Sequence, residues 1–326
     1  MGKRLMVWDV TCLGDLVVDL VPHSVHEGQW LYAPHPGGAP GNVAAGLARL
    51  GRKALMLAKL GDEAFGHMVA ATLVRQGVDT AGVSFATGAK TRLSVVTLDS
   101  VGDRTFIFYG DSPADLLIAA EDIRPEFIAN STILHLGGLL MAGLPSLAAQ
   151  ETAIGLARFS GRLISVDPNF RPSLWADHAA MLQAGRHLVA TADIVKLSEE
   201  ELFALSPGQA IESAARALWH DGLKLMAITR GASGAVMFTV DRAFTCGGFP
   251  VAAIDTTAAG DAFMAALLAS LLDIGMDLTA EDRLANILRP ACAAGALAAT
   301  VKGAMESLPS PKDIAHLLRT GRENPV

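Results

Sequence analysis

Hydrophobic and polar positions along this chain follow two alternating patterns. Short apolar runs typical of buried strands are followed by segments in which apolar residues recur every three or four positions, as in helices that cover a sheet. The strand-like runs are Leu5–Leu13, Ala54–Leu60, Ile133–Leu136, Leu163–Val166, Ile194–Leu197 and Leu225–Thr229. The helix-like segments are Asn42–Leu50, Phe65–Gln76, Leu147–Phe159, Met181–Leu188, Ile211–Trp219 and Ala262–Leu272. This order predicts a mainly parallel sheet covered by helices.

Two pairs of β-rich runs depart from this alternation. Leu93–Asp99 and Arg104–Tyr109 flank the turn Ser100–Asp103, which indicates a hairpin. Ala235–Val240 and Arg242–Cys246 indicate a second hairpin near the end of the alternating region. We therefore expect antiparallel strands in addition to the parallel sheet.

No internal repeat, low-complexity stretch or long linker divides the chain. We expect a single α/β domain over residues 1–326 with a small β-sheet lid. The strands of that lid are expected to come from about residues 14–36 and 92–110.

Composition narrows the class of protein. Of the 326 residues, 51% are hydrophobic and 18% are charged, which allows a sizeable core. The net charge of −7 and the lack of a Lys/Arg block argue against nucleic acid or an anionic membrane as a partner. Cys12, Cys246 and Cys292 form no C-x-x-C pair. With no signal-peptide pattern and no run of about 18 apolar residues, we expect a cytoplasmic protein.

The stretch Asp255–Asp261 places small residues at a predicted helix start, with a carboxylate directly after them. It has two interpretations. Asp255, Thr256 and Thr257 are all good N-cap residues, so the stretch could serve only to begin a helix. Small residues at a helix N-terminus also form an anion site, and Asp261 would stand at its edge as a base. This stretch alone does not decide between them.

A second glycine-rich element lies far upstream, at Pro36–Asn42. Its paired glycines, Gly37 and Gly38, permit a tight turn and close approach by a ligand. Asn42 could cap the following helix or offer its amide to a hydroxyl group. Neither G-x-x-x-x-G-K-[S/T] nor G-x-G-x-x-G occurs, so phosphate binding would be of another kind.

Together the two elements resemble the paired signatures of the ribokinase-like (PfkB) carbohydrate kinases. The first matches from Gly37 to Gly61 and the second from Asp255 to Leu268, in the right order and at the right separation. Motifs between them also match: Asp167–Arg171, Lys196–Glu199 and Thr229–Gly234. The resemblance covers nearly the whole chain. It implies a three-layer α/β/α sandwich and transfer of the γ-phosphoryl group of ATP to a primary hydroxyl of a sugar.

The resemblance also implies catalytic roles for one loop. Asp261 would accept the hydroxyl proton late in the reaction, when the attacking oxygen has become acidic. Backbone N–H groups of Ala259, Gly260 and Asp261 would stabilise the developing phosphoryl charge. Ala258 stands where many family members have glycine, so the loop must hold it away from positive φ.

The residues implied on the sugar side are Asp19, Gly37, Gly38, Asn42, Arg92, Phe108 and Arg171. A carboxylate such as Asp19 suits two ring hydroxyls because it presents acceptors only. Arg92 could instead lie on a solvated strand edge, and Arg171 in a surface ion pair. Phe108 is typical of fructokinases, whereas aminoimidazole riboside kinases tend to have tyrosine there.

The residues implied on the nucleotide side are Lys196, Glu199, Thr229, Gly231 and Gly234. Glu199 would orient water around Mg²⁺, which usually keeps several waters. A monovalent cation, K⁺, would be held by oxygens of Asp255, Thr257, Ala298, Gly303 and Ser307.

Within the family the chain is most similar to fructokinases and aminoimidazole riboside kinases. Fructose is the expected acceptor, and aminoimidazole riboside or another nucleoside is the alternative. A non-catalytic, sugar-binding regulator on a kinase fold is an alternative of another class. The resemblance also implies a homodimer that pairs through the lids.

Overall fold

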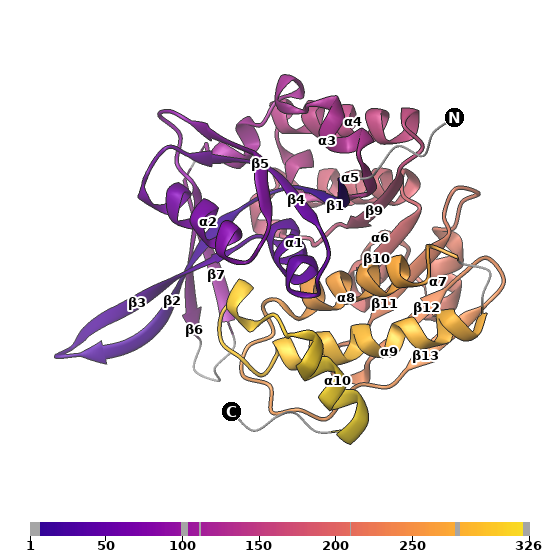
Figure 1. Ribbon diagram of the computed structural model, residues 1–326. Helices are drawn as coiled ribbons and strands as arrows, with labels where there is room; N and C mark the ends of the chain where they lie inside the picture. The colour runs from indigo at the N-terminus through magenta and orange to yellow at the C-terminus, as the bar shows by residue number, and fades with distance from the viewer. Residues whose placement is uncertain (1–6, 99–103, 111, 209, 278–280, 322–326) are drawn as a thin grey trace.

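The computed structural model describes residues 7–98, 104–110, 112–208, 210–277 and 281–321 (Figure 1). Nine strands form the large sheet, in the order β13-β12-β11-β10-β9-β8-β1-β4-β5. Their bounds are β1 Trp8–Leu13, β4 Ala54–Gly61, β5 Asp79–Ala86, β8 Ser131–Gly137, β9 Leu163–Asp167, β10 Ile194–Ser198, β11 Leu225–Thr229, β12 Ala235–Phe238 and β13 Ala243–Cys246.

Every neighbouring pair from β11 to β5 is parallel, and β12 and β13 add antiparallel strands at one edge. The predicted mainly parallel sheet and its second hairpin are therefore confirmed. The strand order reverses between β1 and β8. In an open α/β sheet this reversal opens a crevice at the carboxyl ends of the strands, where ligands bind.

Helices cover both faces of the large sheet (Figure 1). One face is covered by α1 Ala39–Arg49, α2 Ala64–Arg75, α8 Ala259–Asp273, α9 Glu281–Ala298 and α10 Pro311–Thr320. The other is covered by α3 Pro125–Ala129, α4 Leu144–Phe159, α5 His178–Ala190, α6 Glu199–Leu205 and α7 Ile211–Ala217. Successive side chains of a strand point to opposite faces, and both faces are buried, so central strands such as β11 are mostly apolar. None of the described helices is long and apolar enough to cross a membrane.

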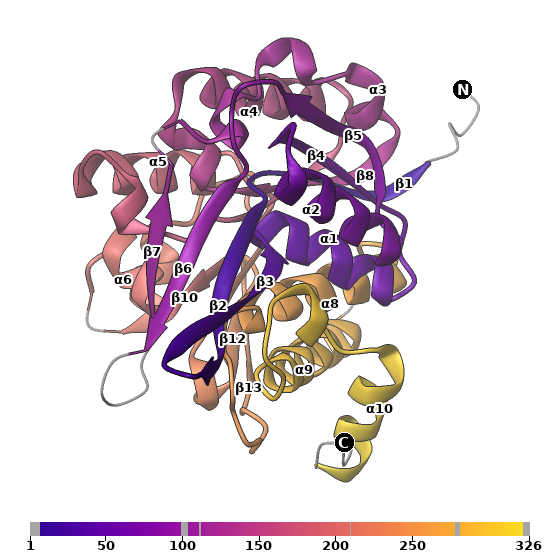
Figure 2. The same ribbon diagram turned by 90° about the vertical axis from the view of Figure 1, so that its left-hand side faces the viewer.

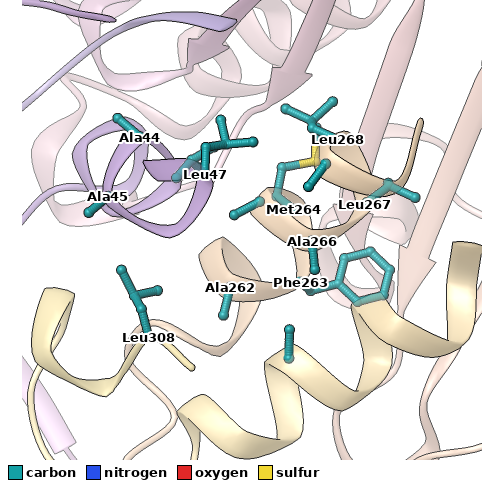
Figure 3. Packing of buried hydrophobic residues seen from close by; sticks show 14 of the residues in the cluster. Ala44, Ala45, Leu47, Ala262, Phe263, Met264, Ala266, Leu267, Leu268 and Leu308 are labelled. Carbon is teal, nitrogen blue, oxygen red and sulfur yellow. The ribbon is translucent and has the colours of Figure 1, made fainter. Parts of the chain in front are cut away.

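Helices α1 and α8 pack closely where they carry the two signature elements. Ala44, Ala45 and Leu47 of α1 lie beside Met264 and its neighbours on α8 (Figure 3). Gly46 makes this approach possible, because a Cβ added there would lie 2.7 Å from the Cβ of Ala265. The packing brings segments more than 200 residues apart into one wall of the site.

Four further strands form a separate small sheet in the order β3-β2-β6-β7. They are β2 Val17–His26, β3 Gln29–Gly37, β6 Arg92–Leu98 and β7 Arg104–Tyr109. Strands β2 and β3 extend away from the body in Figure 1, and Figure 2 shows the sheet from its exposed side. The pairings place Asp19 opposite both His35 and Ser94, and Ser94 opposite Phe108. These four side chains therefore form one row on one face of the sheet.

Several element boundaries differ from the predictions. The helix expected from Asn42 begins at Ala39, with Gly38 as its N-cap residue and Pro40 in its first turn, where a missing N–H costs nothing. Asn42 is therefore not a cap. Helix α7 ends two residues before the predicted end at Trp219. The predicted turn Ser100–Asp103 and the start of the run Leu5–Leu13 lie outside the described residues.

Several short elements were not predicted. They are β5, α3, α6 and the single-turn helices η1 Ala114–Leu117, η2 Ala120–Asp122, η3 Leu139–Ala142, η4 Pro172–Leu174, η5 Gly231–Ser233 and η6 Met305–Ser307. Strand β5 lies at the edge of the sheet and alternates exposed with half-buried residues, so it lacks the apolar run by which the other strands were found.

Candidate active site

A pocket of about 620 Å³ opens where the strand order reverses. Predicted residues that line it are Asp19, Gly38, Asn42, Arg92, Phe108, Arg171, Thr257 and Asp261. Residues that were not predicted also line it, among them Asp15, Gly137, Gly138, Pro168 and Asn169. The pocket is therefore bounded by the small sheet, by α1 and α8, and by the segments that follow β1, β8 and β9.

The stretch that begins α8 has the conformation that the sequence requires. Ala258 is the N-cap residue, with φ −103° and ψ 11°, so alanine is accommodated without a left-handed backbone. The Ala259 N–H donates to the Thr256 carbonyl at 3.2 Å. The N–H groups of Gly260 and Asp261 lie in the first turn, where a helix offers no acceptor of its own. Ala258 has no capping side chain, so Asp255, Thr256 and Thr257 do not cap the helix as the first interpretation expected. The first-turn N–H donors are compatible with the second interpretation, an anion site.

Asp261 is only 4% exposed and faces the pocket. Asn42 Nδ2 donates to Asp261 Oδ2 at 2.7 Å, which joins α1 to α8. Burial raises the pKa of Asp261 to about 7, with Asp167 adding to the rise and the Asn42 hydrogen bond opposing it. A carboxyl group with a pKa near neutrality is a suitable general base.

Asn42 has a second polar atom available to a ligand. Its Oδ1 is buried and has no hydrogen-bond partner among the described residues. A buried acceptor without a partner is costly, so it points to a ligand group that would satisfy it. The interpretation that Asn42 offers its amide to a hydroxyl group fits this geometry.

Asp19 projects from β2 toward the same pocket. It accepts a hydrogen bond from Ser94 Oγ on the neighbouring strand β6. Burial raises the pKa of Asp19, against the lowering effects of Ser94 and Arg171. Gly37 lies behind it, since a Cβ there would be 3.2 Å from Asp19 Oδ2. A larger residue at position 37 would displace this carboxylate.

Arg92 is not on a solvated edge. Its side chain is 5% exposed and forms a two-point ion pair with Asp115, at 2.9 Å for Nε–Oδ2 and 3.2 Å for Nη2–Oδ1. Asp115 is itself buried. Burial raises its pKa, and the lowering effect of the Arg92 charge offsets this rise only in part. Arg92 therefore lines the pocket, but Asp115 already pairs with its positive charge.

Lys196 is buried near the end of β10, beside the N-terminus of α8. Its Nζ donates to Asp167 Oδ2 at 2.8 Å and lies beside Gly260, where an added Cβ would be 3.0 Å away. Burial opposes the charged form, but Asp167, Glu201 and Asp261 outweigh it and raise the pKa of Lys196. The Lys196 ammonium group is thus held next to the α8 N-terminus, where an anion would bind.

Arg171 is exposed and separates this pocket from a neighbouring one of about 770 Å³. Its Nη1 donates to the Phe170 carbonyl at 3.0 Å rather than to an acidic side chain, so the surface ion-pair interpretation has no support. Asn169, beside it, has φ 47°, a conformation that asparagine tolerates. The Phe170 N–H donates to Glu201 Oε1 at 2.8 Å, which anchors the segment to α6.

Glu199 and Glu201 both lie in the first turn of α6, but with different contacts. Glu201 forms a capping box with Ser198, in which Glu201 N donates to Ser198 Oγ at 3.1 Å and Ser198 N donates to Glu201 Oε2 at 2.8 Å. Glu199 is half-buried and not committed to the cap. Asp167 Oδ1, close by, is buried without a partner in the described part of the chain. Carboxylate oxygens of this kind suit Mg²⁺ with its waters.

Thr229 ends β11 directly beside the end of β10, where it pairs with Ser198. The turn after it contains Gly231 with φ 52° and Gly234 with φ 86°. A Cβ at Gly234 would lie 2.2 Å from the Cys246 carbonyl oxygen, whereas a Cβ at Gly231 would meet nothing within 4 Å. Gly234 is needed for packing, and Gly231 leaves the open backbone that a phosphate or ribose could approach.

The loop around Asp255 is tied to the chain after α9. Asp255 Oδ2 accepts from Gly303 N at 2.9 Å, and Oδ1 accepts from Thr257 N at 3.0 Å. Ser307 Oγ donates to Ala304 O at 2.8 Å, so its lone pairs can face a cation. Ala298 ends α9 on this side. These oxygens suit a hard monovalent cation. Within the described residues, His, Cys, Asp and Glu side chains form no group that could hold a metal ion by themselves.

The residues that were missed share a position in the fold. Asp15 and Gly137 follow or end β1 and β8, the two strands at which the order reverses. The signal available in the sequence was Gly14-Asp15 directly after an apolar run, since parallel strands present functional residues at their carboxyl ends. Asp115 and Glu201 act from behind, through Arg92 and Phe170. Ser198-x-x-Glu201 has the sequence pattern of a capping box, whereas the contact of Asp115 with Arg92 follows only from the fold.

A buried carboxylate at a helix N-terminus, an ammonium group beside that helix and a second carboxylate in the same pocket fit a small-molecule phosphotransferase with an alcohol acceptor. The family described as pfkB family carbohydrate kinase matches residues 9–311. The chain belongs to this family, and it is a sugar kinase with the ribokinase-like α/β fold.

Relatives and solved structures agree with this assignment. Fructokinase-2 of Solanum lycopersicum is 38% identical over 317 residues, which is 96% of each chain. A fructokinase from Vibrio cholerae O395, solved with fructose, ADP and calcium, is 34% identical with a TM-score of 0.87, over 96% of this chain and 99% of that one. The aminoimidazole riboside kinase of Salmonella enterica, solved with its riboside and an ATP analogue, is 28% identical with a TM-score of 0.82, over 95% and 99%.

Proposed function

We propose that this protein is an ATP-dependent fructokinase that phosphorylates a primary hydroxyl group of fructose. The observation that carries the proposal is the pairing of Asp261, buried at the start of α8, with Asp19 in one pocket. Fructokinases are also the relatives at 37–38% identity over almost the whole chain. A neutral ketose supplies several hydroxyl donors to these two carboxylates.

The residues of this chain would divide the reaction as follows. Asp19 and the free Oδ1 of Asn42 bind hydroxyl groups and orient the sugar. Asp261 Oδ2 is held by Asn42, which leaves Oδ1 to accept the proton of the attacking hydroxyl group. The N–H groups of Gly260 and Asp261, with Lys196, stabilise charge on the transferring phosphoryl group. Bound ATP supplies that group, and Mg²⁺ near Glu199 would neutralise its phosphates.

Two alternatives remain testable against this proposal. An aminoimidazole riboside would need space for a base beyond the ribose, and the riboside kinase of known structure is less similar at 28% identity. A sugar-binding regulator without catalysis is disfavoured because a regulator has no need for a carboxyl group with a pKa near 7 beside a helix N-terminus.

The test is ADP release with purified protein, ATP, Mg²⁺ and fructose or aminoimidazole riboside. We expect the higher kcat/KM with fructose, and at least a ~100-fold loss of kcat in Asp261→Ala, the usual contribution of a general base. Glu126→Ala, on α3 and outside the pocket, where the glutamate pairs only with the exposed Arg124, is the control and should retain activity. Near-normal turnover in Asp261→Ala would refute the mechanism, and sugar binding without turnover would favour the regulator.

We also propose a K⁺ site formed by oxygens of Asp255, Thr257, Ala298, Gly303 and Ser307. It would brace the loop before Ala258 and so fix the donors of Gly260 and Asp261. Replacing K⁺ by tetramethylammonium at constant ionic strength should lower kcat several-fold, with K⁺ restoring it. An unchanged kcat would argue against the site.

A homodimer through the small sheet is the third element of the proposal. The face opposite the Asp19 row is apolar and open, with Trp30 64%, Ile107 44% and Tyr109 54% exposed. Trp30 lies on β3 and the other two on β7, the two edge strands, so exposed apolar residues extend across this face, as on an interaction surface. A second copy of this chain would cover it.

A further inference from the structure

The charged side chains that line the acceptor pocket are unequal in number. Three are carboxylates, Asp15, Asp19 and Asp261, and each residue is at most 8% exposed. Two are guanidinium groups, Arg92 and Arg171. The balance of charge therefore depends on what these two arginines already contact.

Arg92 contributes little net charge, because Asp115 pairs with it at 2.9 and 3.2 Å from the side away from solvent. Arg171 is exposed at the rim, where water and salt screen its charge. The ammonium group of Lys196, beside Asp261, is paired with Asp167 at 2.8 Å. The three buried carboxylates therefore outnumber the unpaired positive charges, and the pocket is negatively charged when they are ionised.

Asp15 is the one of these carboxylates that the catalytic scheme does not use. It follows the end of β1, and its Oδ1 would lie 3.8 Å from a Cβ at Gly137, the end of β8. Its carbonyl oxygen lies against Gly38, 2.4 Å from where a Cβ would be. Backbone on two sides therefore fixes Asp15 at the point where the strand order reverses.

The Asp15 carboxylate is also open to a ligand. No side chain among the described residues donates a hydrogen bond to it, although it is only 8% exposed. Burial raises the pKa of Asp15 to about 6, and Asp115 adds to the rise while Arg92 and Arg171 oppose it. Its own backbone N–H also lowers the pKa by donating to it, so above pH 7 it is an ionised acceptor with no side-chain donor among the described residues.

We propose that Asp15 is a specificity residue, whose carboxylate accepts a hydroxyl group of an uncharged sugar and repels acceptors that carry a carboxylate or phosphate. This inference rests on the proposed sugar kinase function. A carboxylate has acceptor sites only, so a polyol satisfies it and a second anion cannot. Like charges in a partly buried site repel strongly, which makes rejection of the wrong acceptor a property of the site.

The test compares two acceptors that differ by one charged group. Fructose and 2-keto-D-gluconate share their carbon skeleton and ring hydroxyls, but the latter has a carboxylate in place of the C1 hydroxymethyl group. At pH 8, the kcat/KM ratio of fructose to 2-keto-D-gluconate should fall at least ~10-fold in Asp15→Asn, which removes the charge and keeps the shape. Asp115→Asn, which uncovers the Arg92 charge, should move the ratio in the same direction.

The controls separate specificity from structure and from the assigned reaction. Glu121→Gln, on the exposed side of η2, should leave the ratio unchanged. If Asp15 had a purely structural role, Asp15→Asn would lower the kcat/KM values for both acceptors together. An unchanged ratio of kcat/KM for fructose to 2-keto-D-gluconate in this variant would overturn the inference, even if Asp115→Asn fails to fold. A wild-type enzyme that uses both acceptors equally well would overturn the inference but leave the kinase assignment intact. Turnover with neither would overturn the proposed function, and the inference with it.

Discussion

At the residue scale, the contact between Asn42 and Asp261 acts on the pKa of the proposed base. Burial alone favours the protonated carboxyl group, and the amide donor at 2.7 Å favours the carboxylate. The two effects leave the pKa of Asp261 at about 7. Since the base must be ionised to accept a proton, kcat/KM should rise with pH through this value and level off above it.

Asn42→Ala should move this acid limb to higher pH. The variant removes a donor that lowers the pKa of Asp261, so a smaller fraction of the base is ionised at pH 7. We expect kcat/KM for fructose to fall by about tenfold at pH 7, as for loss of a hydrogen bond to a charged group. The measurement is a full pH profile for wild type and variant.

The shape of the profile distinguishes this effect from lost sugar binding. A binding defect at Asn42 lowers kcat/KM equally at every pH, whereas the pKa effect diminishes toward pH 9. A profile that falls without moving along the pH axis would show that the hydrogen bond does not set the pKa of Asp261.

Single residues were predictable where a backbone constraint or a motif fixes them. Ala258 had to avoid positive φ, and the structure has it at −103°. Asp15, by contrast, is marked only by its place directly after an apolar run, and it becomes part of the pocket only when β8 is placed beside β1. The pairing of Asp115 with Arg92 follows only from the fold, which brings η1 to the start of β6.

At the element scale, the close packing of α1 on α8 aligns the site. Gly46→Ala adds a Cβ that would lie 2.7 Å from Ala265, so one helix must move. Overpacking of this kind costs about 1–3 kcal/mol, and the better helix propensity of alanine offsets up to about 1 kcal/mol. We expect a net loss of unfolding free energy in urea, together with a several-fold lower kcat because Asn42 and Asp261 separate.

Gly155→Ala is the matched control. Gly155 lies in α4, is exposed and has nothing within 4 Å of an added Cβ. The same substitution there should stabilise the protein by about 0.5–1 kcal/mol and leave kcat unchanged. If Gly46→Ala behaved in the same way, close packing of the two helices would not be what aligns the site.

The order and type of the long elements followed from apolar periodicity, because buried strands and amphipathic helices both require it. The boundaries of the elements were harder to predict. Helix α1 begins at Ala39 because Pro40 is accepted in a first turn, although a proline next to glycines favours a loop. The parallel pairing of β2 with β6 joins segments from two regions of the chain, and no local pattern specifies it.

At the scale of the whole molecule, the two faces of the small sheet have different tasks. One face presents Asp19, Ser94 and Phe108 toward the pocket, and the other exposes Trp30, Ile107 and Tyr109. A sheet of four strands that packs on the body along one side gains stability if its open face is covered. Pairing of two copies would thus also hold Asp19 in place.

This arrangement predicts that oligomeric state and sugar affinity change together. In sedimentation velocity, wild type should have twice the 34.0 kDa mass of the chain, and Trp30→Lys should have the single mass, because an ammonium group would be buried without a partner. The monomeric variant should show a higher KM for fructose with a smaller change in KM for ATP, since Asp19 lies on the freed sheet. Phe159→Lys, at a 91% exposed position on α4, is the control and should remain dimeric. A wild-type monomer would contradict the proposed dimer. A monomeric Trp30→Lys with unaltered KM for fructose would show that pairing through the small sheet does not affect sugar binding.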